Sequence, residues 1–413
     1  MNRTSSLLKE AAKVVSNGNC TGCGACALIS SRVNMVLDAH GYMRPSIEES
    51  TNPAYDRQEA ETFRASCPGV SVRARRRQGA SYHETFGTYI SAWQGAARDE
   101  KTRLNGSSGG VLTALAGWLL ESGQISYAIG SNAEPDAPRR TIPVRITTKA
   151  EALAAAGSRY APVSNLTELS DEPDTRTAAI LKPCEATALA QYQDACAVPD
   201  ANRPISLSFF CAGTPSQLAT DRLIDEMGID PLQLQSLRYR GNGWPGEFTA
   251  VGTSGEARSI SYDESWGKHL GRELQWRCKI CPDGTGEHSD ISVGDYWHSD
   301  ERGYPIFENA SGNSAVIART ARGHQLLIEA VEAGVLDLSP VDLDSVSEIQ
   351  PLQRNRRRTI VVRQWARLLS GSRVPSYRGY SFLVTAIKYP RLSLKTFLGT
   401  FLRSVRSKKI NGA

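Results

Sequence analysis

Nine cysteines are the residues of this sequence best suited to chemistry, and the first four lie early in the chain. Cys20, Cys23 and Cys26 are evenly spaced in GNCTGCGAC, and a remote CPG tripeptide supplies Cys67. A C-x2-C-x2-C run can wrap three thiolates around one corner of an iron–sulfur cube, with Cys67 as the available fourth ligand. Zinc also accepts four thiolates, but its sites usually combine CxxC pairs. The even triplet therefore favours a 4Fe-4S cluster over zinc.

Four later cysteines form a second candidate group. The sequence before Cys184 predicts a buried strand over Thr177–Leu181, and PISLSFF predicts another strand before Cys211. Both thiols would then follow the carboxyl ends of strands, the edge at which open α/β sheets bind ligands. RCKICPDG adds Cys278 and Cys281 as a CxxC pair. These four thiolates predict a second 4Fe-4S site. The alternative is that Cys184 and Cys211 are merely buried, beside a separate redox-active CxxC.

The helices beside these cysteines carry their own signals. After Cys211, Thr214 can cap a helix, Pro215 fits its first turn and Gly228 ends it. The ninth cysteine, Cys196, lies inside the plain helical stretch ALAQYQDACAV, so we assign it to neither group. Setting it aside leaves four thiols in each group, as two four-thiolate sites would require.

A Gly/Ser turn is the candidate site for another cofactor. NGSSGGVLTALAGWLLESG starts with this turn and continues as an amphipathic helix up to Gly123. Backbone N–H groups at such a turn form a site for phosphate, although a plain capped turn is an equally simple interpretation. DISVGDYW predicts a short strand that ends at Gly294 and Asp295, where backbone can approach a ligand; Asp295 is otherwise a turn former. Two clusters imply one-electron transfer, and a flavin is the usual adaptor to two-electron substrates.

The elements that must position these residues alternate between strands and helices. With 413 residues, 40% of them hydrophobic and 22% charged, the chain is long enough for two or three domains. We predict a mixed α/β protein in three parts: an N-terminal ferredoxin-like cluster module (1–80), a central α/β domain for the flavin and the second cluster (81–350), and a basic helical tail (351–413).

The net charge of +5 hides a basic end of the chain. Residues 353–413 hold 15 Lys or Arg and no Asp or Glu, whereas the remainder holds 33 basic and 43 acidic residues. A basic amphipathic helix here can pack on the enzyme body, lie on anionic lipid as a peripheral membrane contact, or dock an acidic partner such as a ferredoxin. No nucleic-acid-binding module accompanies the charge, so we expect no nucleic acid partner. The apolar positions of the last helix share one face: Leu394, Phe397, Leu398, Phe401, Leu402 and Val405.

We expect neither a targeting segment nor a membrane span. The first residues, MNRTSSLLKEAAKVVSNG, lack the uninterrupted apolar run of a secretory signal. No stretch approaches the roughly 18 apolar residues that cross a bilayer. We therefore place the protein in the cytoplasm, where clustered thiols indicate metal or redox chemistry rather than disulfides.

No single residue is marked as catalytic. His288 and His298 flank the ISVGD strand and are candidates for a proton donor, although solvent-facing histidines are commoner. Trp244 and Trp297 could stack on a flavin or a substrate, although packing is the commoner role. No motif encodes the substrate or the oligomeric state.

Seven segments occur in a recognisable order: SSGGVLTALAGWLLESG, AAAGSRYAPVSN, LKPCEA, FFCAGTPS, YRGNGWPG, RCKICPDGTGEHSDISVGDYW and SAVIARTARGHQLLIEAVEAGVL. In this order they resemble the coenzyme F(420) hydrogenase/dehydrogenase beta-subunit family, over roughly residues 18 to 345. The resemblance implies non-covalent FAD beside a 4Fe-4S cluster ligated by Cys184, Cys211, Cys278 and Cys281. It implies that the flavin lies near Ser107, Ser108, Gly109, Gly110, Lys182, Gly294 and Asp295.

The N-terminal cysteine module sets this sequence apart from some members of the family and narrows the range of functions that the resemblance implies. The short hydrogenase subunits of this family lack the N-terminal cysteine module, whereas its longer ferredoxin-linked reductases carry it. Examples are 7-hydroxymethyl chlorophyll a reductase and divinyl chlorophyllide vinyl reductase. We therefore expect an iron–sulfur flavoprotein oxidoreductase. It would pass electrons from ferredoxin or a reduced deazaflavin coenzyme through two 4Fe-4S clusters to FAD, and on to a small organic acceptor. The alternatives are a non-catalytic electron-transfer subunit of a larger complex, a role in polysaccharide biosynthesis, and a zinc-stabilised scaffold.

Overall fold

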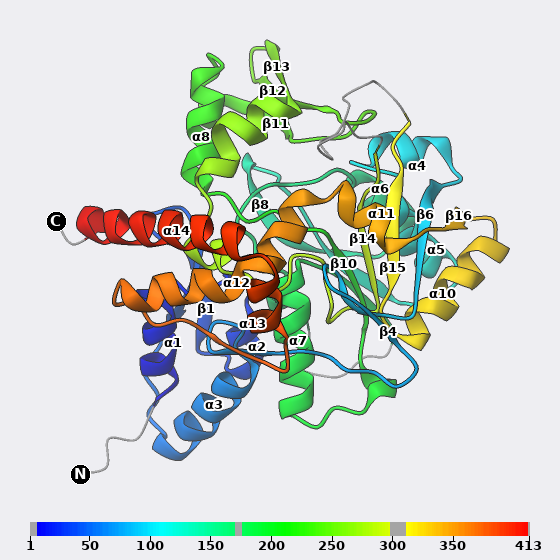
Figure 1. The fold of residues 1–413 in the computed structure, drawn as a ribbon. Coiled ribbons are helices and arrows are strands. Elements are labelled where there is room, and N and C mark those ends of the chain that lie inside the picture. Colours follow the sequence, from blue (N-terminus) through cyan, green and yellow to red (C-terminus); the bar gives the residue numbers. More distant parts are fainter. Residues whose placement is uncertain (1–5, 170–175, 298–310, 412–413) are drawn as a thin grey trace.

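An eight-stranded mixed sheet flanked by helices forms the centre of the molecule (Figure 1). The computed structural model describes residues 6–169, 176–297 and 311–411. The strand order in the sheet is β16-β6-β15-β14-β10-β9-β7-β8. This is the α/β fold class that the sequence predicts. The strands are β6 (Ser91–Ala97), β7 (Tyr127–Glu134), β8 (Ala137–Ile146), β9 (Thr177–Leu181), β10 (Ile205–Phe209), β14 (Ile291–Asp295), β15 (Ser314–Ala318) and β16 (Leu336–Pro340).

Five strands of this sheet run in one direction. β14, β10, β9 and β7 are neighbours in parallel register, with Leu207 opposite Ile291 and Ile205 opposite Ala178. β15 is antiparallel to both β14 and β6, so β6 shares their direction. Strands that run in one direction present their carboxyl ends at the same edge. The segments that follow β6, β9, β10 and β14 therefore start at one edge of the sheet.

Different helices cover the two faces of the sheet, because successive strand residues point to opposite faces. Ala178 packs in a buried cluster with α5 (Val111–Glu121), whereas its neighbour Ala179 packs in another cluster with α7 (Pro183–Ala195). Leu115 of α5 is only 1% exposed. Burying one such leucine contributes about 1.5 to 3 kcal/mol of transfer free energy. Packing of the helices on both faces therefore stabilises the sheet.

The predicted elements around the cysteines are confirmed, apart from one helix start. β9 has the predicted bounds, β14 ends at Asp295, and α5 occupies the predicted amphipathic stretch. The helix after Cys211, α8 (Gln217–Glu226), starts later than predicted. Its N-cap is Ser216 rather than Thr214. Pro215 forms a bridge with Leu274 that holds this part of the chain extended, so the helix begins only after it.

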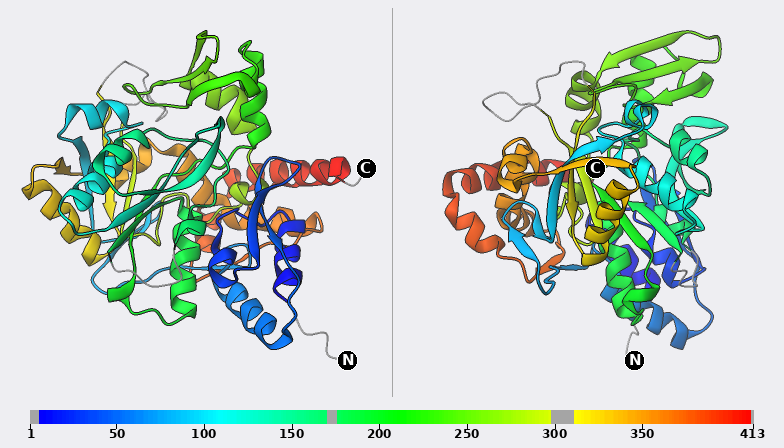
Figure 2. Two further views of the ribbon diagram at one scale, coloured as in Figure 1. Left: turned by 180° about the vertical axis from the view of Figure 1, so that it is seen from behind. Right: turned by 90° about the vertical axis from the view of Figure 1, so that its right-hand side faces the viewer.

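The first elements form a small unit around the first cysteines. Three helices and a hairpin enclose an apolar core that contains Leu7, Cys26 and Phe63. Figure 2 shows this N-terminal segment (blue) beside α7 in both views, and α2 and α3 contact α7. The unit therefore packs on the helix that carries Cys184. Its elements are α1 (Leu7–Ser16), α2 (Ala25–Ile29), β1 (Val33–Leu37), β2 (Met43–Ile47) and α3 (Pro53–Ser66).

The end of the chain is helical, as predicted. Arg367 of its first helix donates from Nη2 to the Asn17 carbonyl oxygen at 2.7 Å, so this region is attached to the N-terminal unit. β17 pairs in parallel with β3, the strand that follows this unit. None of the helices in the described residues is both long enough and apolar enough to cross a membrane. The elements are α12 (Pro351–Leu369), α13 (Phe382–Lys388), α14 (Pro390–Asn411), β3 (Ser71–Arg73) and β17 (Ser376–Arg378).

Smaller elements complete the fold. A separate three-stranded sheet has the order β11-β12-β13. The remaining elements include α4 (Glu100–Asn105), α6 (Lys149–Ala154), α9 (Trp276–Lys279), α10 (Ala321–Glu332), α11 (Leu343–Glu348), β4 (Ser81–His83), β5 (Gly87–Tyr89), β11 (Leu234–Arg238), β12 (Glu247–Gly252) and β13 (Ala257–Ser261).

Candidate metal centre and adjoining pocket

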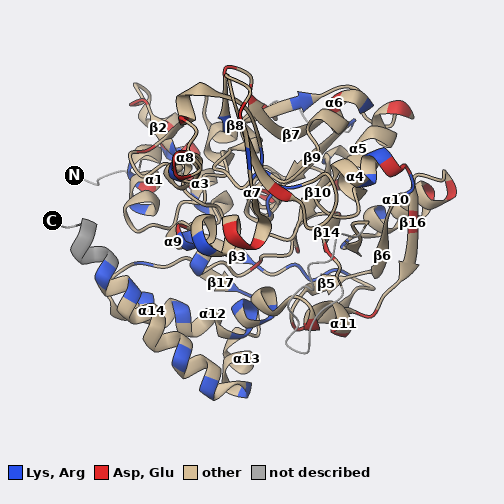
Figure 3. Cartoon of the chain, turned by 90° about the horizontal axis from the view of Figure 1, so that it is seen from above, with Lys and Arg blue, Asp and Glu red and all other residues tan. Residues whose placement is uncertain are grey.

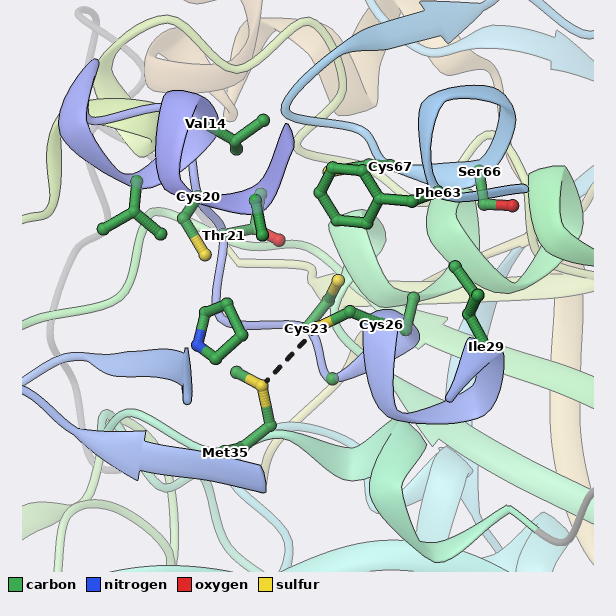
Figure 4. Close-up of a pocket in the computed structure, with 15 residues that line it drawn as sticks. Val14, Cys20, Thr21, Cys23, Cys26, Ile29, Met35, Phe63, Ser66 and Cys67 are labelled. Carbon is green, nitrogen blue, oxygen red and sulfur yellow. Dashed lines mark hydrogen bonds between the residues drawn. The ribbon is translucent and has the colours of Figure 1, made fainter. Parts of the chain in front are cut away.

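The first four cysteines line one pocket. Figure 4 shows Cys20, Cys23, Cys26 and Cys67 around it, together with Met35, whose Sδ lies 3.8 Å from Cys26 Sγ. Burial raises the pKa of each of the four thiols, to about 11 for Cys23. The structure thus brings these thiols together in an apolar environment. Most of the other lining residues are apolar: Ala11, Val14, Val15, Ile29, Pro45 and Phe63.

Two glycines shape the loop that carries three of these cysteines. Gly22 and Gly24 have φ angles of 70° and 84°, the left-handed region in which a side chain is strained. A Cβ atom at Gly22 would also lie 2.8 Å from the Met43 carbonyl oxygen. Gly24 is the N-cap of α2, so Cys26 lies in the first turn of that helix, while Cys67 caps the carboxyl end of α3.

Backbone N–H groups face at least three of these sulfurs, including Cys23, to which the N–H of Ala25 points. The N–H of Gly22 points to Cys20, and those of Gly69 and Val70 point to Cys67. These hydrogen bonds lower the pKa of these three thiols, although the opposing effect of burial is larger. Donors aimed at sulfur favour the thiolate, which is the form that ligates metals.

Three parts of the chain deliver the second group of cysteines to one place. Cys184 lies in the first turn of α7, Cys211 follows β10, and Cys278 and Cys281 lie in and just after α9. Burial raises the pKa of Cys211 to about 12, and negative charge on Cys278 and Cys281 adds to this effect. Charge on Cys211 in turn raises the pKa of Cys184, again after burial. The four thiols therefore share one neighbourhood at the carboxyl edge of the sheet.

Two hydrogen bonds join thiols of the second group to the backbone. The Thr214 N–H donates to Cys278 Sγ at 3.3 Å, and Cys281 Sγ donates to the Asp283 carbonyl oxygen at 2.8 Å. Cys196, in contrast, is exposed at the carboxyl end of α7, which agrees with its assignment to neither group.

Two arginines approach the second group, and sequence reasoning missed both. Arg277 is 2% exposed and donates from Nη2 to the Pro68 carbonyl oxygen at 3.0 Å, beside Cys67. Arg356 of α12 donates from Nη1 to the Cys211 carbonyl oxygen at 3.2 Å. Burial raises the pKa of Cys281, while both guanidinium groups lower it. The available signal for Arg356 is the basic stretch 353–413, but its composition alone predicts only a basic helical tail.

The two groups of thiols adjoin each other. Burial is the largest cause of the raised pKa of Cys184, and negative charge on Cys23 of the first group adds to it. Cys23 also belongs to the same buried cluster as Ala186 and Leu189 of α7. Arg277 spans the same boundary, because it lies among the second group and bonds beside Cys67.

No three Cys, His, Asp or Glu side chains within residues 6–169, 176–297 and 311–406 are close enough to share a single metal ion. Four thiolates on one zinc ion would lie about 4 Å apart, since each Zn–S bond measures about 2.3 Å. A cube of iron and sulfide is larger than one metal ion, so its four thiolate ligands lie farther apart than the four thiolates of a zinc site.

The predicted Gly/Ser turn lies against the edge formed by β14 and β15. Ser108 Oγ donates to the Asn313 carbonyl oxygen at 2.6 Å, and the Gly109 N–H donates to Ser314 Oγ at 2.9 Å. Ser314 is the register partner of Asp295 at the end of β14. The turn and the strand end, which are far apart in sequence, are thus brought together.

The Arg240 side chain links the Gly/Ser turn to the end of β14. It is 4% exposed, and it donates from Nη1 to Asp295 Oδ2 at 2.8 Å and from Nη2 to the Ser107 carbonyl oxygen at 2.6 Å. Gly110 begins α5 at a φ of 72° without a side-chain cap. The Phe210 ring packs so close to the Gly294 backbone that a Cβ atom at position 294 would overlap the ring.

Lys182 lies with the second group of thiols. Its Nζ is 2.9 Å from Glu185 Oε1, and both side chains are buried. Burial lowers the pKa of Lys182, but the charges of Glu185 and Cys184 outweigh burial and raise it. The ammonium group is therefore part of an internal ion pair next to Cys184.

A cavity of about 420 Å³ adjoins the Gly/Ser turn. It lies between the β7-β8 hairpin, the segment 154–159 and β11, and it is lined by Arg159 and Arg238. Within the described parts of the chain, neither guanidinium has a carboxylate partner; burial lowers the pKa of both. The Ser158 N–H donates to Ser107 Oγ and joins the cavity to the turn. Sequence reasoning missed this cavity, although AAAGSRYAPVSN contains one of the arginines.

The remaining candidates are structural or lie outside the described residues. His288 is buried: Nε2 lies 2.8 Å from the Arg73 carbonyl oxygen, and burial lowers the pKa of the imidazole. The expectation of a solvent-facing histidine is therefore wrong for His288, and His298 lies outside the described residues. Trp244 and Trp297 stack on each other at a centroid distance of 6.4 Å, as packing predicts.

Comparison with known families gives two matches, both to the beta subunit of coenzyme F(420) hydrogenase/dehydrogenase. Residues 92–170 match the N-terminal region of this family, and residues 174–344 match its C-terminal region. These two ranges cover more than half of the chain and include Cys184, Cys211, Cys278 and Cys281. The first group of cysteines precedes both.

Individual relatives agree with these matches. The chain is 25% identical over 293 residues to the coenzyme F(420) hydrogenase subunit beta of Methanococcus voltae, covering 68% of this chain and 96% of that protein. It is 23% identical over 370 residues to the coenzyme F(420)-dependent sulfite reductase of Methanocaldococcus jannaschii, covering 85% of this chain and 52% of that enzyme. The fold matches a chain of the F(420)-reducing NiFe hydrogenase complex from Methanosarcina barkeri, with a TM-score of 0.53, 20% identity, and 69% and 94% coverage of the two chains.

Proposed function

Because this chain belongs to the coenzyme F(420) hydrogenase/dehydrogenase beta-subunit family, we propose that it is an oxidoreductase that carries electrons through two 4Fe-4S clusters to FAD and on to a small organic acceptor. The named relatives are oxidoreductases or oxidoreductase subunits. We keep three functional parts in this proposal: the cluster module 1–80, the flavin and cluster domain 81–350, and the basic tail 351–413.

The chemistry of the donor set supports the first cluster. Cys20, Cys23, Cys26 and Cys67 line one pocket, with Cys23 and Cys26 buried and the other two half-buried, and backbone N–H groups face Cys20, Cys23 and Cys67. Without a bound group, four thiolates could not share so apolar a place, because burial penalises each charge. These residues would hold the cluster, and the N–H groups would stabilise its sulfur ligands.

Cationic groups support the second cluster. Cys184, Cys211, Cys278 and Cys281 would ligate it. Arg277 lies buried among them and contributes charge of the opposite sign. A cluster with four thiolates is anionic overall, so guanidinium groups at this site offset the electrostatic cost of burying it.

The arginine-lined cavity supports a flavin nucleotide. Arg159 and Arg238 are half-buried at this cavity and have no carboxylate partner among the described residues, and a phosphate group is the ligand whose geometry matches a guanidinium best. Arg159 and Arg238 would bind the pyrophosphate, and the turn at Ser107–Gly110 would hold the flavin close to the sheet edge. A bound flavin exchanges electrons singly with clusters and in pairs with organic substrates.

The adjacency of Cys23 and Cys184 carries the proposal. Cys23 packs in one buried cluster with Ala186 and Leu189 of α7, and its negative charge contributes to the raised pKa of Cys184 across the boundary between the N-terminal unit and α7. Charge could therefore pass between the two groups without leaving the protein. The donor would be ferredoxin or a reduced deazaflavin coenzyme, since the relatives are named for F(420), and the site of action would be the reducing cytoplasm.

A second candidate is a non-catalytic electron-transfer subunit of a larger complex. One observation favours it: the similar solved chain is part of an F(420)-reducing hydrogenase complex. In this case the isolated protein would reduce no small acceptor, and a partner subunit would restore electron transfer.

Anaerobic purification tests the proposal directly. We expect about eight irons and eight acid-labile sulfides per chain, together with one non-covalent FAD. The Cys211→Ser variant should lose about half of the iron. Cys196→Ser is the matched control and should lose none, because its thiol is exposed and remote from both groups. A colourless protein that contains zinc and no flavin would refute the proposal.

A further inference from the structure

The last helix exposes three of its four leucines and buries several of its small polar residues. Leu394, Leu398 and Leu402 of α14 are 62%, 51% and 56% exposed. Thr400 and Ser404 are 2% and 0% exposed. A surface helix of a soluble protein normally turns its apolar stripe toward the core. The six apolar positions predicted to share one face are instead divided: Phe397, Phe401 and Val405 are half-buried, whereas the three leucines are exposed.

Hydrogen bonds to α12 fix this orientation. Arg367 Nη1 donates to Ser404 Oγ at 3.2 Å, and the hydroxyl oxygens of Ser370 and Ser404 lie 2.6 Å apart. Rotating α14 to bury its leucines would break these contacts and leave buried polar groups without partners, which costs free energy. The leucines therefore face outward in the folded protein.

The exposed apolar surface continues onto the preceding helix. Leu383, Val384 and Ile387 of α13 are 51%, 57% and 69% exposed, and α13 contacts α14. We call these three side chains and the three leucines of α14 the C-terminal apolar face. Exposed apolar side chains gathered on two contacting helices mark a candidate site of interaction.

The charged residues of α12, α13 and α14 are all positive, and Glu84, from outside these helices, pairs with Arg358 and Lys388. Residues 353–413 contain no Asp or Glu, and Figure 3 shows Lys and Arg, but no acidic residue, along α12, α13 and α14. The exposed cations on or beside the face are Lys388, Arg391, Lys395, Arg403 and Arg406.

We propose that the C-terminal apolar face docks on an anionic lipid surface. Leucine, isoleucine and valine side chains would enter the boundary of the acyl region, while the neighbouring Lys and Arg side chains contact lipid phosphates. A second copy of the chain is a poorer occupant, because it would bring identical positive charges face to face. The attachment would be peripheral, with the helix lying in the plane of the membrane.

Vesicle flotation of the full-length protein tests this proposal. We expect it to float with vesicles of phosphatidylcholine that contain phosphatidylglycerol, and to float far less with phosphatidylcholine alone. Raising the salt concentration should weaken binding, because the contribution of exposed charges is screened. Failure to bind anionic vesicles at low salt would overturn the proposal.

Substitutions test whether vesicle binding depends on the C-terminal apolar face or on exposed leucines in general. The triple variant Leu394→Ser, Leu398→Ser and Leu402→Ser should weaken vesicle binding by about a hundredfold. The matched control replaces three exposed leucines elsewhere, Leu8→Ser, Leu218→Ser and Leu232→Ser, and should bind normally. Equal binding by the two triple variants would refute the proposal. So would absent vesicle binding combined with a dimer that the α14 variant, but not the control, dissociates.

A charge-reversal pair tests the electrostatic part. Arg391→Glu with Lys395→Glu should weaken binding to anionic vesicles by about a hundredfold, whereas Lys9→Glu with Lys101→Glu should change it little. Cluster and flavin content should be unaltered in every variant, so a failure of this proposal can be distinguished from a failure of the redox proposal.

Discussion

Cys23 in the loop before α2 and Cys184 in the first turn of α7 are electrostatic neighbours. Negative charge on Cys23 contributes to the raised pKa of Cys184, after the larger effect of burial. The two residues belong to different groups of four cysteines, and α2 contacts α7 directly. A centre at one group is thus adjacent to a centre at the other.

The adjacency of the two groups predicts the effect of removing one thiol at their boundary. The Cys184→Ser variant should retain about four irons per chain, because the first group remains complete. Its remaining cluster should still be reduced by dithionite, but electrons should no longer reach the flavin rapidly. Stopped-flow absorbance and metal analysis measure both effects. Rapid flavin reduction in this variant would contradict the proposed route.

Arg356 should raise the reduction potential of the second centre. Its guanidinium favours negative charge at Cys281 and Cys211, and reduction adds negative charge. The Arg356→Met variant should lower the midpoint potential of one centre by on the order of 100 mV. A potentiometric titration followed by electron paramagnetic resonance measures this shift. Arg57→Met, an exposed substitution on α3, is the control and should leave both potentials unchanged.

The arginines of the cavity should determine flavin affinity. The Arg238→Gln variant removes a charge-assisted contact with phosphate and should weaken FAD binding by about 10- to 100-fold. Flavin fluorescence during reconstitution gives the dissociation constant. Arg258→Gln, on the exposed β13 of the same small sheet, should bind FAD normally. Unchanged affinity in the Arg238 variant would place the flavin elsewhere.

Because His288 is buried, we predict that the folded protein loses stability in mild acid. Burial lowers the pKa of His288 in the folded protein from its ordinary value of 6.5, so the unfolded chain takes up the proton first. The stabilising contribution is present above pH 6.5 and is lost as the pH falls toward the folded-state pKa, by up to about 1.4 kcal/mol per pH unit.

Denaturant unfolding between pH 5 and pH 7 checks this prediction for His288. The His288→Gln variant should lose this part of the pH dependence, and His40→Gln, at an exposed position, should keep it. An unchanged slope in the His288 variant would show that other groups cause the acid sensitivity.

Local patterns predicted the elements near the chemistry well. β9 and β14 were expected from short apolar runs, and α5 from its helical periodicity. The start of α8 was placed too early, because Thr214 and Pro215 carry correct local signals that the bridge to Leu274 overrides. A bridge to a distant segment cannot be read from neighbouring residues.

The sequence by itself determined which residues could bind metal, since C-x2-C-x2-C, KPC and CxxC are local patterns, and it determined that strands lead into Cys184 and Cys211. Tertiary structure alone decided that Cys23 packs against the helix that carries Cys184, that Arg356 reaches the Cys211 carbonyl group, and that α14 turns three leucines outward. The physical reason is that each of these depends on how separate elements pack. Periodicity defines the faces of a helix, but only its partners decide which face is buried.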